Sequence, residues 1–231
     1  KFLGSSEEID RFPDKSLSFR EYKKSSIYKS DAPFPWFFLP MSRTINIDGN
    51  YLGVDKIGHF FGFGRRYYNN YNKFIKEGST EEEAIERSIN VGIHFEKYLV
   101  GRLVDGVFSY ADLEADYRGL RLAIDLSSNE DYFKLQDGKW TQEKNIDIRN
   151  YVNPDFDESY NNSHYWLLRK RKVLPQLGRY CDKKNGEIVE GRFENYRKQE
   201  HSFSYNYIRE HFKKKGKNQK DKQCLENLCG K

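Results

Sequence analysis

One glutamate interrupts an otherwise apolar stripe in the sequence. The stripe lies on a helix predicted from Glu81 to Leu103, where its members recur at spacings of three and four positions, the period of one helix face. They are Ile85, Ile89, Gly92, Glu96, Leu99 and Leu103. Because burial disfavours the ionised form of a carboxyl group, Glu96 is expected either to keep its proton in an apolar pocket or to pair with a buried cation.

A protonated carboxyl group in such a position is suited to breaking a glycosidic bond. The reaction needs an acid beside the leaving oxygen, and often a second, ionised carboxylate that stabilises or attacks the sugar or activates water. Glu96 fits the role of the acid. Glu114, on the segment after the next turn, is the predicted second carboxylate, with Asp112 and Asp105 in reserve. Asp112 ranks behind Glu114 because it is also placed to cap a helix.

A structural ion pair is the alternative role for Glu96. Arg65, Arg66 or Arg102 could turn inward and neutralise the carboxylate, since charges buried in proteins are normally paired. The two roles make opposite demands on the surroundings. A catalytic acid needs a cleft beside it, whereas an ion pair can lie in a sealed interior.

A second helix, predicted from Val54 to Ile75, carries a histidine that can assist the site. Asp55 and His59 are four residues apart and share a helix face, so that the carboxylate can hold the imidazole in one tautomer. We expect these two residues to support the catalytic groups. Gly58 and Gly62, on the same helix, are expected to leave a groove for the close approach of another backbone.

Neither a metal ion nor a cofactor is predicted. The side chains that could ligate a metal near Glu96 are Asp55, His59, His94 and Glu96 itself. His94 and Glu96 are two positions apart on a helix and point in different directions, so they cannot bind the same ion. Hydrolysis by a pair of carboxyl groups needs no cofactor.

Aromatic residues are unusually abundant. The chain has 17 Phe, 17 Tyr and 3 Trp, which make up 16% of its residues. Most of these rings are expected in the core, but an aromatic face also stacks well on a sugar ring. The residues predicted to form the sugar-binding walls are Tyr67, Tyr71, Tyr98 and Tyr110.

Capping boxes mark the starts of two helices. Thr80 is followed by Glu83, and Ser109 by Asp112, at the spacing that lets each pair satisfy the first backbone amides of a helix. The helix after Ser109 presents one apolar face, formed by Leu113, Tyr117, Leu120 and Ile124. Both helices are therefore expected to pack into a core.

The remaining pattern indicates a mostly α-helical α+β protein. A short strand and turn are predicted at Thr44–Asn50, and Asp137-Gly138 is a candidate hairpin turn. We expect one globular domain over residues 31–212, an N-terminal arm at 1–30 and a basic C-terminal tail at 213–231. No segment approaches the run of about 20 apolar residues that a membrane span requires.

The order of these elements resembles a known superfamily. A helix with Glu96 between aromatic neighbours near its end, a short extended piece at Val107-Phe108-Ser109-Tyr110 and a following helix are similar to the arrangement in the lysozyme superfamily, including goose-type lysozymes and lytic transglycosylases. The resemblance covers about residues 80–125. It implies a lysozyme-like globular domain with a small β element, Glu96 as general acid, and peptidoglycan, for instance a deacetylated form, as substrate.

Charge distribution suggests an anionic partner. The net charge is +5, but residues 165–231 alone carry 18 basic and 8 acidic side chains. A basic region of this kind favours an anionic polymer such as a cell-wall glycan. Nucleic acid is not predicted as a partner because no recognised nucleic-acid-binding motif occurs. The alternative to a hydrolase is therefore a non-catalytic envelope protein that binds an anionic wall polymer through its basic C-terminal half. A monomer is expected in either case.

The predicted compartment is secreted or periplasmic. The sequence begins at Lys1 without an initiator Met or an apolar leader, which predicts a processed chain whose signal peptide has been removed. A disulfide from Cys181 to Cys224 or Cys229 would staple the polar tail to the body, and a Cys224–Cys229 loop is the alternative. Either bond implies an oxidising compartment. The string Asp55–Phe60 is also similar to one in bacterial envelope proteins.

Overall fold

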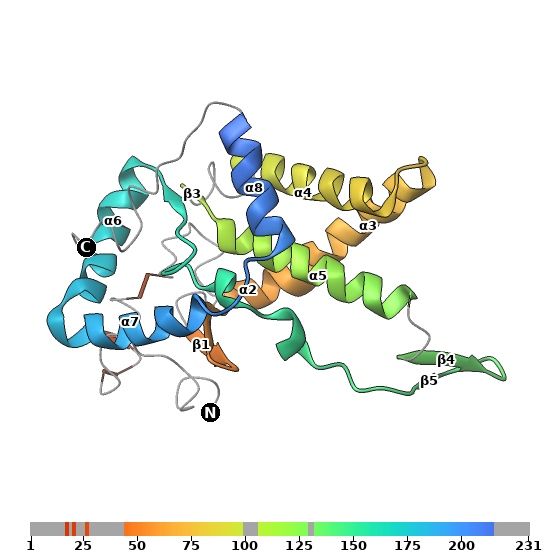
Figure 1. Ribbon diagram of the computed structural model, residues 1–231, viewed down its shortest axis with the longest axis horizontal. Helices are drawn as coiled ribbons and strands as arrows, with labels where there is room; N and C mark the ends of the chain where they lie inside the picture. The colour runs from red at the N-terminus through yellow and green to blue at the C-terminus, as the bar shows by residue number, and fades with distance from the viewer. Residues whose placement is uncertain are drawn as a thin grey trace.

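The structure is a computed structural model that describes residues 17–18, 20–21, 26–27, 44–98, 106–128 and 132–214. Within these ranges the protein is mostly α-helical with small antiparallel sheets, which confirms the predicted α+β class (Figure 1). Several predicted features lie outside the described residues. They are Leu99, Leu103, Arg102, Asp105, Cys224 and Cys229, with most of the N-terminal arm and of the C-terminal tail.

The first sheet is a hairpin in which β1 (Thr44–Ile47) pairs antiparallel with β2 (Asn50–Gly53). Asp48 and Gly49 form the turn with φ angles of 51° and 83°. Asn46 Oδ1 accepts a hydrogen bond from the Gly49 amide at 2.8 Å and so holds the turn. The predicted strand and turn are confirmed. The second strand of the hairpin, β2, was not predicted.

A continuous helical segment follows the hairpin. It consists of α2 (Asp55–Gly58), a π-helical turn η2 (His59–Phe63) and α3 (Gly64–Lys76), which confirms the helix predicted from Val54 to Ile75. The π-helical turn begins at His59. Such turns are uncommon within helices and often occur at functional sites.

The helix α4 (Glu81–Tyr98) begins with the predicted capping box. The Thr80 amide donates to Glu83 Oε2 at 2.9 Å, and the Glu83 amide donates to Thr80 Oγ1 at 3.3 Å. The described members of its stripe, Ile85, Ile89, Gly92 and Glu96, are all buried. The cap therefore sets the start of α4, and the stripe faces the core.

The helix α5 (Tyr110–Ser128) lies at the centre of the bundle and packs against α3, α4 and α8 (Phe203–Lys214) (Figure 1). Ser109 caps it, because the Asp112 amide donates to Ser109 Oγ at 3.1 Å. The predicted apolar face of Leu113, Tyr117, Leu120 and Ile124 is buried. This face joins side chains from α3, α4 and α8 in one hydrophobic cluster.

An antiparallel hairpin projects from the end of α5, formed by β4 (Phe133–Gln136) and β5 (Lys139–Gln142) (Figure 1). Its turn is Asp137-Gly138, as predicted, with φ angles of 51° and 75°. Two 3₁₀ turns, η4 (Ile148–Tyr151) and η5 (Pro154–Phe156), then lead the chain back along α5.

The last third of the chain packs a second cluster of apolar side chains. Strands β3 (Val107–Phe108) and β6 (His164–Tyr165) pair before α6 (Leu167–Gly178), the 3₁₀ turn η6 (Arg179–Cys181) and α7 (Lys183–Tyr196). Residues of α6 and α7 form most of this second cluster. Among the described residues, no helix has both the length and the apolar character needed to cross a bilayer.

Candidate acid–base site

Glu96 lies at the end of the described part of α4 and is only 5% exposed. Its Oε1 accepts a hydrogen bond of 3.1 Å from the backbone amide of Ser109, the residue that caps α5. Burial and the nearby charge of Asp112 raise the pKa of Glu96 to about 8. Glu96 is therefore mostly protonated near neutral pH, as its place in the apolar stripe predicted.

The arginines predicted as alternative partners of Glu96 are placed elsewhere. The Arg66 guanidinium lies over the ring of Phe95, 3.8 Å from its centre, and Arg65 is exposed. In the described parts of the chain, no arginine forms an ion pair with Glu96. The structural ion pair with Arg65 or Arg66 is therefore wrong, and Arg102 lies outside the described residues.

Asp112, on the first turn of α5, is the carboxylate that affects Glu96 most strongly. Its Oδ1 lies 2.5 Å from the Lys56 ammonium, and its Oδ2 lies 3.5 Å from His59 Nε2. Burial alone would raise the pKa of Asp112, but the attraction of His59 and Lys56 outweighs burial and lowers it. Two neighbouring carboxyl groups thus hold opposite protonation states near neutral pH.

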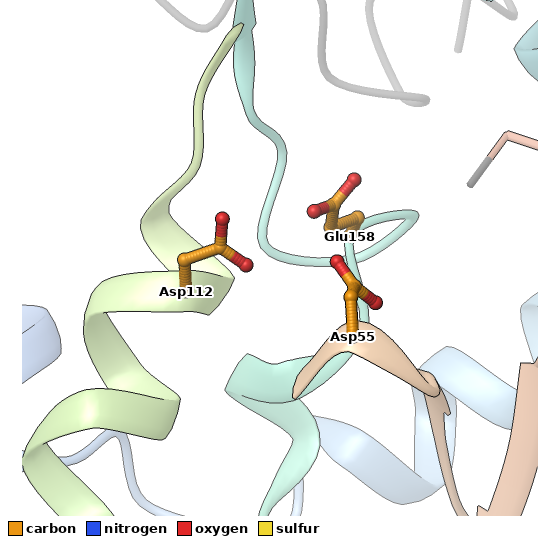
Figure 2. A group of neighbouring side chains, drawn as sticks. All are labelled: Asp55, Asp112 and Glu158. Atoms are coloured by element: carbon orange, nitrogen blue, oxygen red, sulfur yellow. The ribbon is translucent and has the colours of Figure 1, made fainter. Parts of the chain in front are cut away.

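Lys56 is a fully buried cation at the centre of the site, with 0% of its surface exposed. Its Nζ lies 2.7 Å from Asp55, 2.5 Å from Asp112 and 2.5 Å from Glu158. The three carboxylates come from α2, α5 and the loop after η5, and they gather around one space (Figure 2). Their oxygens lie within 4.8 Å of one another, a spacing that suits a metal ion, but the Lys56 ammonium already binds all three.

His59 joins two carboxylates of α5 rather than Asp55. Its Nδ1 lies 2.9 Å from Asp116 Oδ1, and its Nε2 faces Asp112. The predicted Asp55–His59 pair is wrong because Asp55 turns to the neighbouring Lys56. Although burial opposes its charge, Asp112 and Asp116 raise the pKa of His59 to about 10. Burial also raises the pKa of Asp116, to about 6, against the attraction of His59.

The raised pKa of His59 predicts a loss of stability at alkaline pH. The folded protein holds this proton up to about pH 10, whereas unfolded histidine releases it near 6.5. The contribution to the free energy of unfolding is therefore complete below 6.5 and lost as the pH rises through the folded value, by on the order of a few kcal/mol. Urea unfolding across this window, with the His59 ring titration followed by NMR, checks the prediction. A ring that titrates near 6.5 in the folded protein would contradict it.

Glu114, the predicted second carboxylate, does not face Glu96. It is 1% exposed and belongs to a separate cluster, where it accepts from Arg118 Nε at 2.9 Å, Asn153 Nδ2 at 2.8 Å and Ser202 Oγ at 2.5 Å. Two positions along a helix turn a side chain by about 200°, so Asp112 and Glu114 point in nearly opposite directions. The first choice of partner is thus wrong, and the reserve residue Asp112 is the carboxylate whose charge acts on Glu96.

No family model, curated protein or solved structure matches the chain. The function of the site must therefore be inferred from its own geometry. The resemblance to the lysozyme superfamily therefore stays a hypothesis. Replacement of Glu96 can test it.

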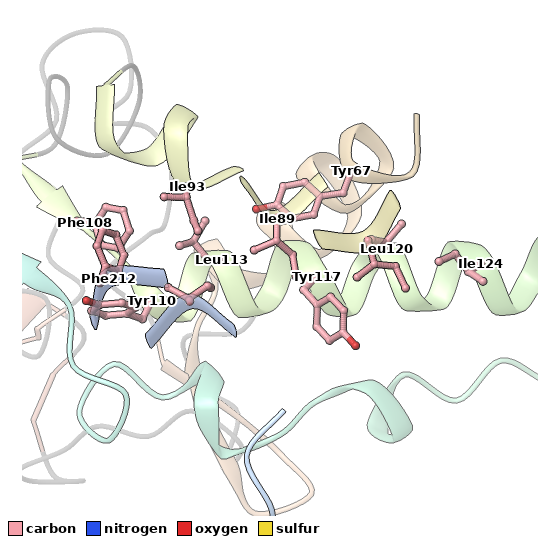
Figure 3. Close-up of a cluster of buried hydrophobic side chains, with 12 residues drawn as sticks. Tyr67, Ile89, Ile93, Phe108, Tyr110, Leu113, Tyr117, Leu120, Ile124 and Phe212 are labelled. Carbon is pink, nitrogen blue, oxygen red and sulfur yellow. The ribbon is translucent and has the colours of Figure 1, made fainter. Parts of the chain in front are cut away.

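Two of the four tyrosines predicted as sugar-binding walls lie in the core. Tyr67 and Tyr110 are 2% and 6% exposed, and Figure 3 shows both among buried side chains of α3, α4 and α5. The Tyr67 hydroxyl lies against Gly92, which has no side chain to obstruct it. A role in an open groove is therefore wrong for these two. Tyr98 is 44% exposed and its ring packs against His94 at an interplanar angle of 49°, and Tyr71 is partly buried, so the role of these two tyrosines stays a prediction.

Sequence reasoning missed three charged residues of the site, which are Lys56, Asp116 and Glu158. Glu158 lies in a loop, where neither periodicity nor a motif marks it. Lys56 did leave a signal. It lies four residues before Phe60 and eleven before Tyr67, so it shares the helix face that both rings bury.

Proposed function

We propose that the protein is a lysozyme-like hydrolase that cleaves the glycan strands of peptidoglycan, with Glu96 as its general acid. One observation carries the proposal. Glu96 keeps its proton near neutral pH while the neighbouring Asp112 stays ionised. A pair of carboxyl groups whose pKa values are driven apart by their surroundings supplies an acid and a base in one place.

The contacts of Glu96 assign its proton to one oxygen. Because Oε1 accepts the Ser109 amide, the proton resides on Oε2, which is the oxygen able to donate it. In the proposed reaction Glu96 protonates the glycosidic oxygen as the bond to the anomeric carbon breaks. The Asp112 carboxylate then stabilises the positive charge that develops on the sugar, or activates the attacking water. Asp112 replaces Glu114 in this role.

The basic groups of the site keep Asp112 available as an anion. Lys56 and His59 contact one oxygen each of the Asp112 carboxylate. Asp116 fixes the other ring nitrogen of His59, and Glu158 fixes the Lys56 ammonium. Each positive charge therefore has a second partner that holds it in position, and Asp112 remains charged beside the acid.

Peptidoglycan is the proposed substrate because the sequence pattern around Glu96 resembles lysozymes and the C-terminal third of the chain is basic. Peptidoglycan carries carboxylates on its peptide stems, which a basic protein attracts. An enzyme acting on this polymer works outside the cytoplasm, so the proposed compartment is the periplasm or the cell exterior.

Replacing Glu96 by Gln tests the proposal. The amide keeps the shape of the side chain but cannot donate a proton as an acid, so lysis of purified sacculi should fall by about 10²–10⁴-fold. Turbidity reports lysis, and co-sedimentation with sacculi reports binding, which should persist. Glu82→Gln, on an exposed position of the same helix, is the matched control and should lyse like the parent. A parent protein without lytic activity, or an active E96Q variant, would contradict the proposal.

A non-catalytic wall-binding protein is the second candidate. Exposed basic side chains on α6 and α8, among them Arg171, Lys213 and Lys214, favour it. In this case the buried charges around Lys56 serve folding alone. The same assay separates the two candidates, because a wall-binding protein sediments with sacculi but leaves their turbidity unchanged.

A further inference from the structure

Tyr67 is a buried ionisable residue for which the proposed reaction has no role so far. Its ring is 2% exposed and reaches from α3 across to α4, where the hydroxyl lies against Gly92 (Figure 3). A side chain at Gly92 would displace the hydroxyl, because an added Cβ would lie 1.5 Å from it. Gly92 and Glu96 are four residues apart and share one face of α4. The phenol is therefore placed about one helical turn from the general acid.

A tyrosine at this position is unfavourable for stability in two ways. Its hydroxyl is buried without a regular hydrogen bond to any residue that the structure describes, and burial of such a group opposes folding. Its ring also requires a glycine inside α4, where glycine is a poor helix former. A shorter apolar side chain would fill the cluster and avoid both effects. Two unfavourable features at one point indicate that the hydroxyl has a role beyond packing.

The Tyr67 hydroxyl lies among the acids of the candidate site. Asp116 acts on it both as a charge and as a hydrogen-bond acceptor, and Glu96 is the next charge that affects it. Burial, and after it the charges of Asp116 and Glu96, raise the pKa of Tyr67 well above its ordinary value, so the phenol keeps its proton. Tyr67 is therefore a hydrogen-bond donor within reach of two carboxyl groups.

The two acids hold different protonation states near neutral pH. Burial raises the pKa of Asp116 to about 6 and that of Glu96 to about 8, so Asp116 is mostly ionised and Glu96 is mostly protonated. One oxygen of each is already bound, since Asp116 Oδ1 lies 2.9 Å from His59 Nδ1 and Glu96 Oε1 accepts the Ser109 amide at 3.1 Å. The phenol therefore donates to the ionised Asp116 as long as Glu96 keeps its proton.

We propose that Tyr67 is a positioning residue whose hydroxyl donates a hydrogen bond to Asp116 in the resting enzyme and to the Glu96 carboxylate once Glu96 has protonated the leaving oxygen. Tyr67 keeps its own proton throughout, and only its hydrogen bond changes partner. The proton of Glu96 goes to the glycosidic oxygen, and the carboxylate that remains gains a donor. A contact that strengthens as charge develops lowers the barrier rather than the affinity for substrate. The inference rests on the proposed function for the reaction, and Tyr67 acts from the core rather than as a sugar-binding wall.

Replacing Tyr67 by Phe tests these contacts without any assay of lysis. The variant keeps the ring and loses only the hydroxyl, so circular dichroism should show the same helix content as in the parent. The ionised forms of Asp116 and Glu96 each lose a donor, so both pKa values should rise, and both acid dissociation constants should fall by about tenfold. Titration of the side-chain carboxyl carbons by NMR measures both values.

Tyr117→Phe is the matched control for this variant. The Tyr117 ring is also buried, at 7% exposure, and also belongs to the main hydrophobic cluster. After burial, the groups that act on its hydroxyl most strongly are Arg121 and Glu114, which lie outside the acid–base site. Its carboxyl titrations at Asp116 and Glu96 should therefore equal those of the parent.

Lysis of purified sacculi gives a second measurement. Because Glu96 becomes a weaker acid in Y67F, the rate of lysis near neutral pH should fall by about tenfold. The alkaline limb of the pH profile, which follows the loss of the Glu96 proton, should move to higher pH. Co-sedimentation with sacculi should stay unchanged, since a ring that is 2% exposed does not touch the substrate.

An unchanged Glu96 titration in Y67F would overturn the inference. So would a slower lysis whose pH profile stays in place, because a purely structural role of the ring gives that pattern. Failure of the hydrolase is a separate outcome. A parent that does not lyse sacculi, with both titrations displaced in Y67F, contradicts the hydrolase and supports the hydrogen bonds of Tyr67. Lysis that depends on Glu96, with titrations that Y67F leaves unchanged, removes only the role of Tyr67.

Discussion

Replacing Lys56 by methionine is expected to lower the free energy of unfolding by about 3–5 kcal/mol, because it leaves buried carboxylates without their counter-charge. Lys56 is fully buried, and its ammonium contacts Asp55, Asp112 and Glu158 at 2.5–2.7 Å. Methionine matches the length of the side chain but supplies no charge and no donor. The three carboxylates would then repel one another with no cation between them. Urea unfolding near neutral pH measures the loss.

The matched control for this variant is Lys73→Met on α3. Lys73 has a 70% exposed side chain and lies 3.8 Å from Glu77, so its removal should cost about 0.5 kcal/mol or less. If the K56M protein is too unstable to fold near neutral pH, its stability at lower pH provides a second measurement. Lowering the pH protonates the freed carboxylates, so the variant should approach the parent in stability as the solution becomes acidic. A loss below about 1 kcal/mol would contradict the assigned role of Lys56.

Local signals in the sequence predicted the elements of this fold well. The capping box at Thr80, the turn at Asp137-Gly138 and the apolar face of α5 depend only on residues a few positions apart. Their physical causes, which are unsatisfied amides, positive φ angles and the helix period, act within one element. The structure therefore reproduces each of them at the predicted place.

The partner of Glu96 could not be predicted in the same way. The helix period shows that Asp112 and Glu114 point to different sides of α5, but it does not show which side faces α4. That choice depends on how the helices pack. The Ser109 amide settles it by binding Glu96, which brings the first turn of α5, and Asp112 with it, against the end of α4. The spacing of residues within one helix does not reveal a contact of this kind between two helices.

Lys56 shows a different reason for failure. A lysine next to an aspartate on a helix is normally exposed. A prediction from residue type therefore places Lys56 at the surface, whichever helix face it occupies. Its position was the better guide, because Phe60 and Tyr67 on the same face are both buried. Glu158, which completes the cluster, is contributed by a loop far along the chain. A buried lysine is stable only where several acids converge, and the sequence alone does not place them together.

The glycines at which two helices approach closely also differ from those predicted from spacing. Gly58 and Gly62 were predicted to receive another backbone, but a side chain added at either would meet no atom within 4 Å. The close approach occurs instead between Gly64 at the start of α3 and Gly119 in α5.

Gly119→Ala is therefore expected to destabilise the protein by about 3 kcal/mol or more, at the upper end of the cost of overpacking. An added Cβ would lie 1.9 Å from the Phe60 carbonyl oxygen and 2.8 Å from the Gly64 Cα. Both are backbone atoms, so no side-chain rotation relieves the clash and the helices must separate. Gly191→Ala, at an exposed position of α7 with no atom within 4 Å, is the control and should stabilise by about 0.5–1 kcal/mol.

The G119A substitution is also expected to affect His59 in the candidate site. His59 precedes Phe60, so a shift of this backbone away from α5 moves the imidazole away from Asp116, which lies 2.9 Å from it on that helix. The G119A protein should therefore show a lower pKa for His59 by NMR in addition to its loss of stability, whereas G191A should leave that titration unchanged. A G119A protein of parental stability would mean that α3 and α5 are not in backbone contact. The arrangement of Lys56, His59 and Asp112 around Glu96 would then lack its structural basis.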